Sequence, residues 1–141
     1  MTPDQIRLVQ DSFRHVALIR EAAAKLFYEH LFAIDPALRA LFSSTDMHRQ
    51  GTKLMATLGF VVHQLDRPET IFPMARELGK RHVHYGVEER HYKAVERALI
   101  ETLAATLGSA FTPQLREAWH ETIAALTGVM IEAARENVAA C

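Results

Sequence analysis

Cysteine is nearly absent from this chain: the single one among 141 residues is Cys141, at the last position. This excludes an intramolecular disulfide framework, as is typical of proteins from a reducing compartment. A strong charge of one sign is missing too, because the formal net charge is only -1. General nucleic-acid binders and membrane-surface binders carry a clear basic excess, so the composition argues against both as partners.

Long apolar runs and secretion signals are also missing. No apolar segment approaches the roughly 20 residues that cross a bilayer, and the N-terminus lacks the pattern of a cleavable signal. Hydrophobic residues make up 49% and charged residues 23%, which is ordinary for a globular protein. We therefore expect one domain over residues 1–141, located in the cytoplasm.

The sequence also lacks strand alternation, hairpin turns and internal repeats. Apolar residues instead recur every three or four positions, with proline and glycine at the boundaries. This predicts an all-α domain of six to eight helices, and their unequal lengths favour orthogonal packing around a pocket over an up-and-down bundle. The longest helices are expected near residues 6–16, 21–34, 49–65, 88–107 and from 113 onward. Thr2-Pro3-Asp4-Gln5 resembles a capping box at the start of the first helix.

The stretch from Leu78 to Tyr92 organises the second half of the chain. We expect a short helix through its first part that ends at Gly86, because glycine adopts a left-handed cap without a Cβ clash. Leu78 and His82 are four residues apart and share a helix face. His82 would then point inward beside Leu78, Val87 and Tyr92. Such an imidazole is either a satisfied core histidine or a ligand to something held in the core.

Several short motifs occur in the order and at the spacing of the globin family. Each is weak alone, whereas their joint order is specific. The chain resembles bacterial single-domain haemoglobins and the globin domain of flavohaemoglobins, from Ile6 to about Met130. This resemblance implies a globin fold that encloses haem b (iron protoporphyrin IX). The motifs are Phe27-Tyr28, Asp35-Pro36, Leu41-Phe42, Lys53-Leu54, His82, Tyr85-Gly86-Val87, Tyr92 and Ala118-Trp119.

The resemblance assigns one side of the haem to the region of His82. His82 matches the proximal histidine and would be the metal ligand, with the Leu78 carbonyl accepting the proton of its other nitrogen. Phe42 matches an aromatic that wedges against the porphyrin, although an ordinary core phenylalanine would be buried equally. Lys53 and Arg81 would either pair with haem propionates or be solvated surface charges. The other implied haem contacts are Phe27, Leu54, Val87, Tyr92, Val95 and Leu126.

On the ligand side, Tyr28 matches the tyrosine that donates its hydroxyl to bound oxygen in these bacterial proteins. Gln50 lies one turn before Leu54 and matches the position where animal myoglobins carry histidine; alternatively it is a solvated surface amide. His48, two residues earlier, is the rival distal ligand. Tyr28 and Gln50 are therefore the two candidate reactive side chains.

The remaining histidines are expected on the surface or too far from the iron to bind it. One departure from the flavohaemoglobin pattern is Ala134, which occupies the position of a glutamate that hydrogen-bonds the proximal imidazole. The absence of this glutamate weakens the case for peroxidase-like chemistry.

The histidines expected on the surface or too far from the iron are His15, His30, His63, His84, His91 and His120.

Reversible binding of dioxygen, and of other diatomic ligands such as NO and CO, is the first function that the resemblance implies. The alternative is nitric oxide dioxygenation, which converts NO and dioxygen to nitrate. The sequence ends at Cys141 without a reductase domain, so turnover would need a separate NAD(P)H-dependent reductase. A haem-based gas sensor is a third possibility, although such sensors usually continue into an output domain.

Overall fold

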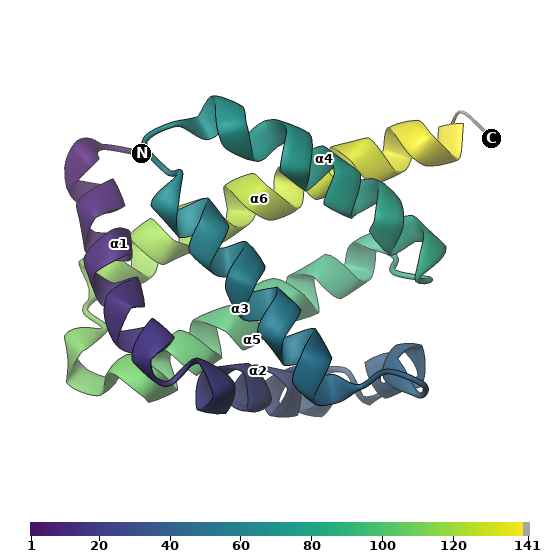
Figure 1. The fold of residues 1–141 in the computed structure, drawn as a ribbon, viewed down its shortest axis with the longest axis horizontal. Helices are drawn as coiled ribbons and strands as arrows, with labels where there is room; N and C mark the ends of the chain where they lie inside the picture. Colours follow the sequence, from purple (N-terminus) through teal and green to yellow (C-terminus); the bar gives the residue numbers. More distant parts are fainter. Residues whose placement is uncertain (140–141) are drawn as a thin grey trace.

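The computed structural model describes residues 1–139, with side chains through Glu136, and Cys141 lies outside the described residues. In this range the chain forms six α-helices and two 3-10 helices without any strand, which confirms the predicted all-α class (Figure 1). No helix in this range is long and apolar enough to span a membrane. The elements are α1 (Pro3–Leu18), α2 (Arg20–Ile34), η1 (Pro36–Phe42), α3 (Met47–His63), α4 (Pro68–His84), α5 (Glu89–Leu107), η2 (Gly108–Ala110) and α6 (Pro113–Ala139).

Most helix boundaries follow from capping chemistry. Thr2 and Gln5 form the predicted capping box at the start of α1. The Thr112 hydroxyl accepts a hydrogen bond from the Leu115 amide, 3.2 Å away, where α6 begins. Gly86 takes a φ of 85° directly after α4, as predicted, because a residue with a Cβ is disfavoured in that conformation.

The helix that carries His82 is longer than the short helix predicted from the sequence. α4 is 17 residues long and contains Pro73, which removes a backbone donor and normally interrupts a helix. Ile71, Ala75 and Gly79 are nevertheless buried along one face of α4, and α4 packs along α6. Tertiary packing of this face offsets the lost hydrogen bond, which sequence spacing alone does not reveal.

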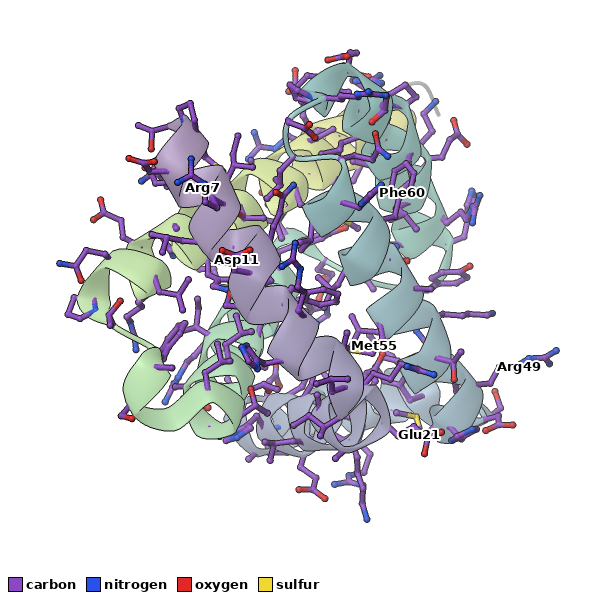
Figure 2. The ribbon with its side chains drawn as sticks, turned by 60° about the vertical axis from the view of Figure 1, so that its left-hand side comes forward. Arg7, Asp11, Glu21, Arg49, Met55 and Phe60 are labelled. Carbon is purple, nitrogen blue, oxygen red and sulfur yellow. The ribbon has the colours of Figure 1, made fainter. Side chains whose placement is uncertain are left out.

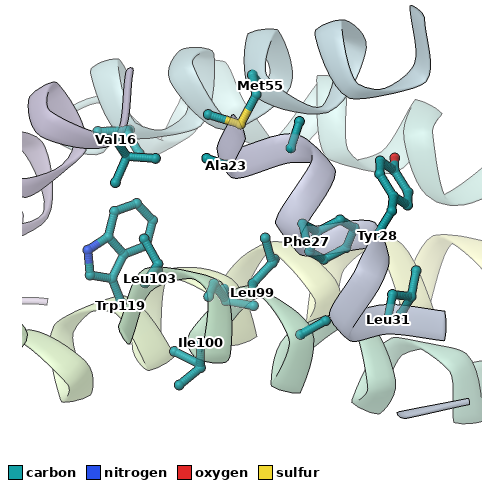
Figure 3. Packing of buried hydrophobic residues seen from close by; sticks show 14 of the residues in the cluster. Val16, Ala23, Phe27, Tyr28, Leu31, Met55, Leu99, Ile100, Leu103 and Trp119 are labelled. Carbon is teal, nitrogen blue, oxygen red and sulfur yellow. The ribbon is translucent and has the colours of Figure 1, made fainter. Parts of the chain in front are cut away.

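The hydrophobic core is divided into two clusters. The larger one joins α1, α2, α3, α5 and α6 around Trp119, which is 1% exposed (Figure 3). The Trp119 indole N–H donates to the Ser12 hydroxyl across 2.9 Å and connects α6 to α1. The smaller cluster contains Tyr92 and Met130 and lies against α4. α3 and α4 diverge after the turn that joins them and contact each other little (Figure 1).

Candidate functional site

His82 lies near the end of α4 with one ring nitrogen committed to the backbone. Its Nδ1 is 2.6 Å from the Leu78 carbonyl oxygen, and a carbonyl can only accept, so Nδ1 carries the proton and donates. The described side chains give Nε2 no hydrogen-bond partner. Burial lowers the pKa of His82 below its ordinary 6.5, the Leu78 hydrogen bond opposes this, and the Arg81 charge adds to it. A neutral imidazole therefore presents an Nε2 lone pair, which is the form that binds metals.

The turn after α4 joins Val87 to His82 through the backbone. The Val87 amide donates to the His82 carbonyl at 3.0 Å, and the Gly86 amide donates to the Val83 carbonyl at 3.1 Å. These two bonds are the Schellman pair that closes a helix with a left-handed glycine. Backbone geometry thus fixes the position of Val87 relative to His82.

Two tyrosine rings flank His82, one exposed and one buried. The Tyr85 ring centroid is 5.6 Å and the Tyr92 centroid 6.5 Å from that of the imidazole. Tyr85 is 59% exposed, whereas Tyr92 is 4% exposed. The Tyr92 hydroxyl oxygen is buried without a partner among the described residues, and burial raises the pKa of Tyr92 to about 12.

The other predicted haem contacts lie at the margins of the two core clusters. Phe42, Leu54 and Val95 pack on the larger cluster, and Phe27 belongs to its interior. Leu78, Val87 and Leu126 pack on the smaller cluster together with Tyr92. Except for Phe27 and Tyr92, all of these side chains are half-buried. Apolar side chains that are packed on one side and accessible on the other fit a flat apolar ligand such as a porphyrin.

Tyr28 lies in an aromatic group at the junction of α2, α3 and η1. Its ring centroid is 4.9 Å from that of Phe27 and 5.5 Å from that of Phe42. Burial raises the pKa of Tyr28 to about 12, and hydrogen bonding to the Gln50 side chain offsets part of this rise. The structure thus brings together Tyr28 and Gln50, which is half-buried on α3.

Phe32 is part of this aromatic group but was not singled out from the sequence. Its ring centroid is 5.5 Å from that of Phe42 and 6.1 Å from that of Tyr28. The Arg39 guanidinium lies 4.8 Å from the Phe32 centroid, a cation–π distance. The available signal was the spacing of Tyr28 and Phe32, one helical turn apart.

The two predicted propionate partners, Lys53 and Arg81, and the rival distal ligand, His48, are all exposed. Lys53 and Arg81 are solvent-accessible, and neither forms an ion pair with the described side chains. Both are compatible with propionate pairing and with simple solvation. His48 is exposed in the first turn of α3, where its backbone amide donates to Asp46 Oδ1 at 3.1 Å.

The expectation that His91 lies on the surface is wrong. His91 is 6% exposed, and its Nδ1 accepts a hydrogen bond from the Glu88 amide at 2.9 Å. The Glu88 carboxylate completes a capping box at the start of α5. The spacing of an N-cap residue and an acceptor three positions later was the missed signal. His30 is also partly buried and lies 3.1 Å from Glu101, whereas the other histidines expected on the surface are exposed.

Known proteins resemble this chain in sequence. A 29% identical neuroglobin of Danio rerio matches over 125 residues, covering 79% of each chain. A flavohemoprotein of Rhodopirellula baltica is 28% identical over 129 residues, which is 89% of this chain and 31% of the relative. A flavohemoprotein of Deinococcus radiodurans is 27% identical over 133 residues, which is 93% of this chain and 33% of the relative. The chain thus spans about a third of the length of these two curated flavohemoproteins.

Solved structures share the fold. A hexacoordinated heme protein from an anhydrobiotic tardigrade aligns with a TM-score of 0.87 at 18% identity, covering 96% of both chains. An engineered carbene transferase, made from a candidate nitric oxide dioxygenase of Rhodothermus marinus, aligns with a TM-score of 0.88 at 24% identity, covering 99% of this chain and 97% of the other. The globin family model itself matches residues 25–130. The chain therefore belongs to the globin family.

Proposed function

We propose that this globin binds haem b through His82 and uses it to bind dioxygen reversibly, together with other diatomic gases such as NO and CO. Globins bind haem and gaseous ligands, so the proposal concerns which residues of this chain do so. The state of His82 carries it: a neutral imidazole with Nδ1 tied to Leu78 and Nε2 free. When bound, the haem would supply a ferrous iron with one position for a gas molecule.

Most of the proposed site residues would hold the haem and keep water away. The Leu78 carbonyl fixes the tautomer and the orientation of the His82 ring. The half-buried side chains of Leu54, Val87 and Val95, with Phe27, Phe42, Tyr92 and Leu126, would surround the porphyrin with apolar surface. Lys53 and Arg81 would pair with its propionates at the solvent-exposed edge.

Tyr28 and Gln50 would stabilise the bound gas. The Gln50 side chain opposes the rise in the pKa of Tyr28, as expected if its amide donates to the phenol oxygen and so favours the phenolate. That arrangement leaves the phenol proton free to be donated elsewhere. A donor pointing at a ligand with partial negative charge would slow its release.

Replacement of His82 by alanine tests the proposal directly. The variant purified without added ligand should lose most of its haem and its Soret band, and added imidazole should restore both by occupying the space of the missing ring. His84→Ala is the matched control, because His84 is exposed two residues away on the same helix and should behave as wild type. An unchanged Soret band in His82→Ala, without imidazole or a substitute ligand, would refute the assignment.

Nitric oxide dioxygenation is the second candidate, favoured by the Tyr28–Gln50 pair and by the flavohemoprotein relatives. The conversion of NO and dioxygen to nitrate consumes one electron per turnover, which a separate NAD(P)H-dependent reductase would supply. Stopped-flow mixing of the oxygenated protein with NO should yield one nitrate per haem, and further turnover should require an added reductase. Absence of nitrate would exclude this activity. We also propose that the protein is located in the cytoplasm.

A further inference from the structure

Two residues outside the predicted site, Phe32 and Arg39, complete the surroundings of Tyr28. Phe32 lies one turn after Tyr28 on α2, and Arg39 lies on η1, three residues before Phe42. The ring planes of Tyr28 and Phe42 meet at 66° and those of Phe32 and Phe42 at 64°, which are the edge-to-face arrangements that aromatic pairs prefer. Each of these three rings contacts the other two, so Tyr28 is one corner of a closed group.

Arg39 and Phe42 hold η1 on α2 through the same ring. Residues three apart in a 3-10 helix lie on one side of it, and both of these side chains contact Phe32, at 4.8 Å from the guanidinium and 5.5 Å between ring centroids. Arg39 forms no ion pair among the described side chains. Because α2 is the element against which η1 packs most, the contacts of Phe32 determine where η1 places Phe42.

Tyr28 depends on these contacts because one side of it borders open space. Tyr28, Phe32 and Arg39 all line a groove of about 910 Å³ between α2 and α3. A side chain that is close-packed on every side keeps one orientation, whereas a ring beside a groove has room to turn. Hydrogen bonding to Gln50 restrains the hydroxyl but leaves the plane of the ring undetermined. The rings of Phe32 and Phe42 supply the missing restraint from the side of η1.

We propose that Phe32 and Arg39 are positioning residues: Arg39 fastens η1 to Phe32, and the Phe32–Phe42 pair then holds the Tyr28 ring so that its hydroxyl points at the bound gas. The inference rests on the proposed function, because it assigns the direction of the Tyr28 hydroxyl in that same site. Neither Phe32 nor Arg39 is among the proposed haem contacts. Their loss should therefore change the release of the gas without removing the haem.

Arg39→Gln and Phe32→Leu test the two ends of this arrangement. The first removes the cation, and the second removes the ring but keeps an apolar side chain of similar size. Arg49→Gln is the matched control, because it makes the same charge change beside Gln50, whereas Arg49 is exposed and extends from α3 into solvent (Figure 2). Arg39→Lys keeps a cation and should retain most of the wild-type behaviour.

The infrared C–O stretch of the CO complex reports whether a hydrogen-bond donor faces the bound gas. Tyr28→Phe provides the band of a site without the Tyr28 hydroxyl. Arg39→Gln and Phe32→Leu should each add a band at that position, and dioxygen release should accelerate about threefold and about fivefold, respectively. Arg49→Gln should keep the wild-type band and rate. A wild-type band and rate in either test variant would overturn the role of that residue, even if its thermal stability falls, since a merely structural role changes stability alone.

Nuclear magnetic resonance of the haem-free protein tests the positioning without the cofactor. The nuclear Overhauser effect between the Tyr28 ring and the Gln50 side-chain amide should weaken in Arg39→Gln and Phe32→Leu and stay constant in Arg49→Gln. An unchanged effect in both test variants would contradict the proposal. If the wild-type protein takes up no haem, the proposed function fails, and this measurement still decides whether the two residues position Tyr28.

Discussion

Tyr28 and Tyr92 are the two buried phenols of the molecule, and they differ in the partner of their hydroxyl. Burial raises the pKa of each to about 12, so both remain protonated donors at neutral pH. Tyr28 interacts with Gln50, whereas the Tyr92 oxygen is buried without a partner among the described residues. The proposed roles follow this difference: Tyr28 acts on the gas ligand, and Tyr92 contributes mainly its ring beside His82.

Tyr28→Phe is expected to speed dioxygen release about tenfold, because it removes one hydrogen bond and keeps the ring. The rate is measured by mixing the oxygenated protein with excess CO in a stopped-flow spectrometer. Tyr92→Phe is the matched control. It removes a hydroxyl without a partner among the described residues and should leave the release rate within about twofold of wild type and the stability equal or higher. Equal release rates for wild type and Tyr28→Phe would show that the hydroxyl does not contact the ligand.

His82 should make the haem-free protein less stable in mild acid. Its pKa is lowered in the folded state relative to the ordinary 6.5, so the unfolded chain binds the proton more readily. The contribution of His82 to stability is complete above pH 6.5 and is lost as the pH falls through the lower folded pKa. Urea unfolding at intervals from pH 7.5 to 5 measures this slope. His82→Gln should flatten it; the same slope in both proteins would contradict the lowered pKa.

At the scale of elements, the contact between α4 and α6 sets the position of His82. Gly79, one turn before His82, is so close to α6 that a Cβ built on it would lie 2.3 Å from the Met130 carbonyl oxygen. The neighbouring atoms are backbone, which cannot move aside as a flexible side chain can. Glycine at this position therefore determines how closely α4 approaches α6.

Gly79→Ala is predicted to destabilise the protein by about 2–3 kcal/mol, because the added methyl group forces two helix backbones apart. Gly128→Ala on α6 is the control, since a Cβ there meets nothing within 4 Å. It should stabilise by about 0.5–1 kcal/mol through the higher helix propensity of alanine. Thermal and urea unfolding measure both values. A Gly79→Ala protein as stable as wild type would mean that the helices separate at no cost.

The helix ends were predictable because their signals are local. The capping box at Thr2 and the left-handed turn at Gly86 depend on a few neighbouring residues and appear where the sequence predicts them. The length of α4 was not predictable, because burial against α6 overrides the signal of Pro73. His91 was misplaced for a related reason: its ring turns back to cap α5 and is covered by the fold.

At the scale of the whole molecule, the hydrophobic core is divided into two clusters. The larger cluster joins five helices without α4, while the smaller cluster secures α4. The sequence placed Tyr92 beside His82, and the two ring centroids are 6.5 Å apart.

Haem removal is expected to loosen α4 and the turn at residues 85–88 more than the rest of the protein. A ligand that binds only the folded state stabilises it, and here the contacts of the ligand would lie along α4. Hydrogen exchange of the haem-free and haem-loaded forms measures this effect. Amide protection in α4 should fall at least about tenfold, with a smaller change in α1 and α5. A uniform change along the chain would contradict the assignment of the haem to this region.

Trp119 gives the protein an optical reporter of its own. It is the only tryptophan in the sequence, it is almost fully buried, and its indole N–H is bound to Ser12 of α1. Its ultraviolet emission therefore comes from a single environment and should shift to longer wavelength when α1 separates from α6. A porphyrin absorbs in the range where tryptophan emits, so haem uptake should quench the same signal. One fluorescence titration can thus follow cofactor loading and unfolding without any label.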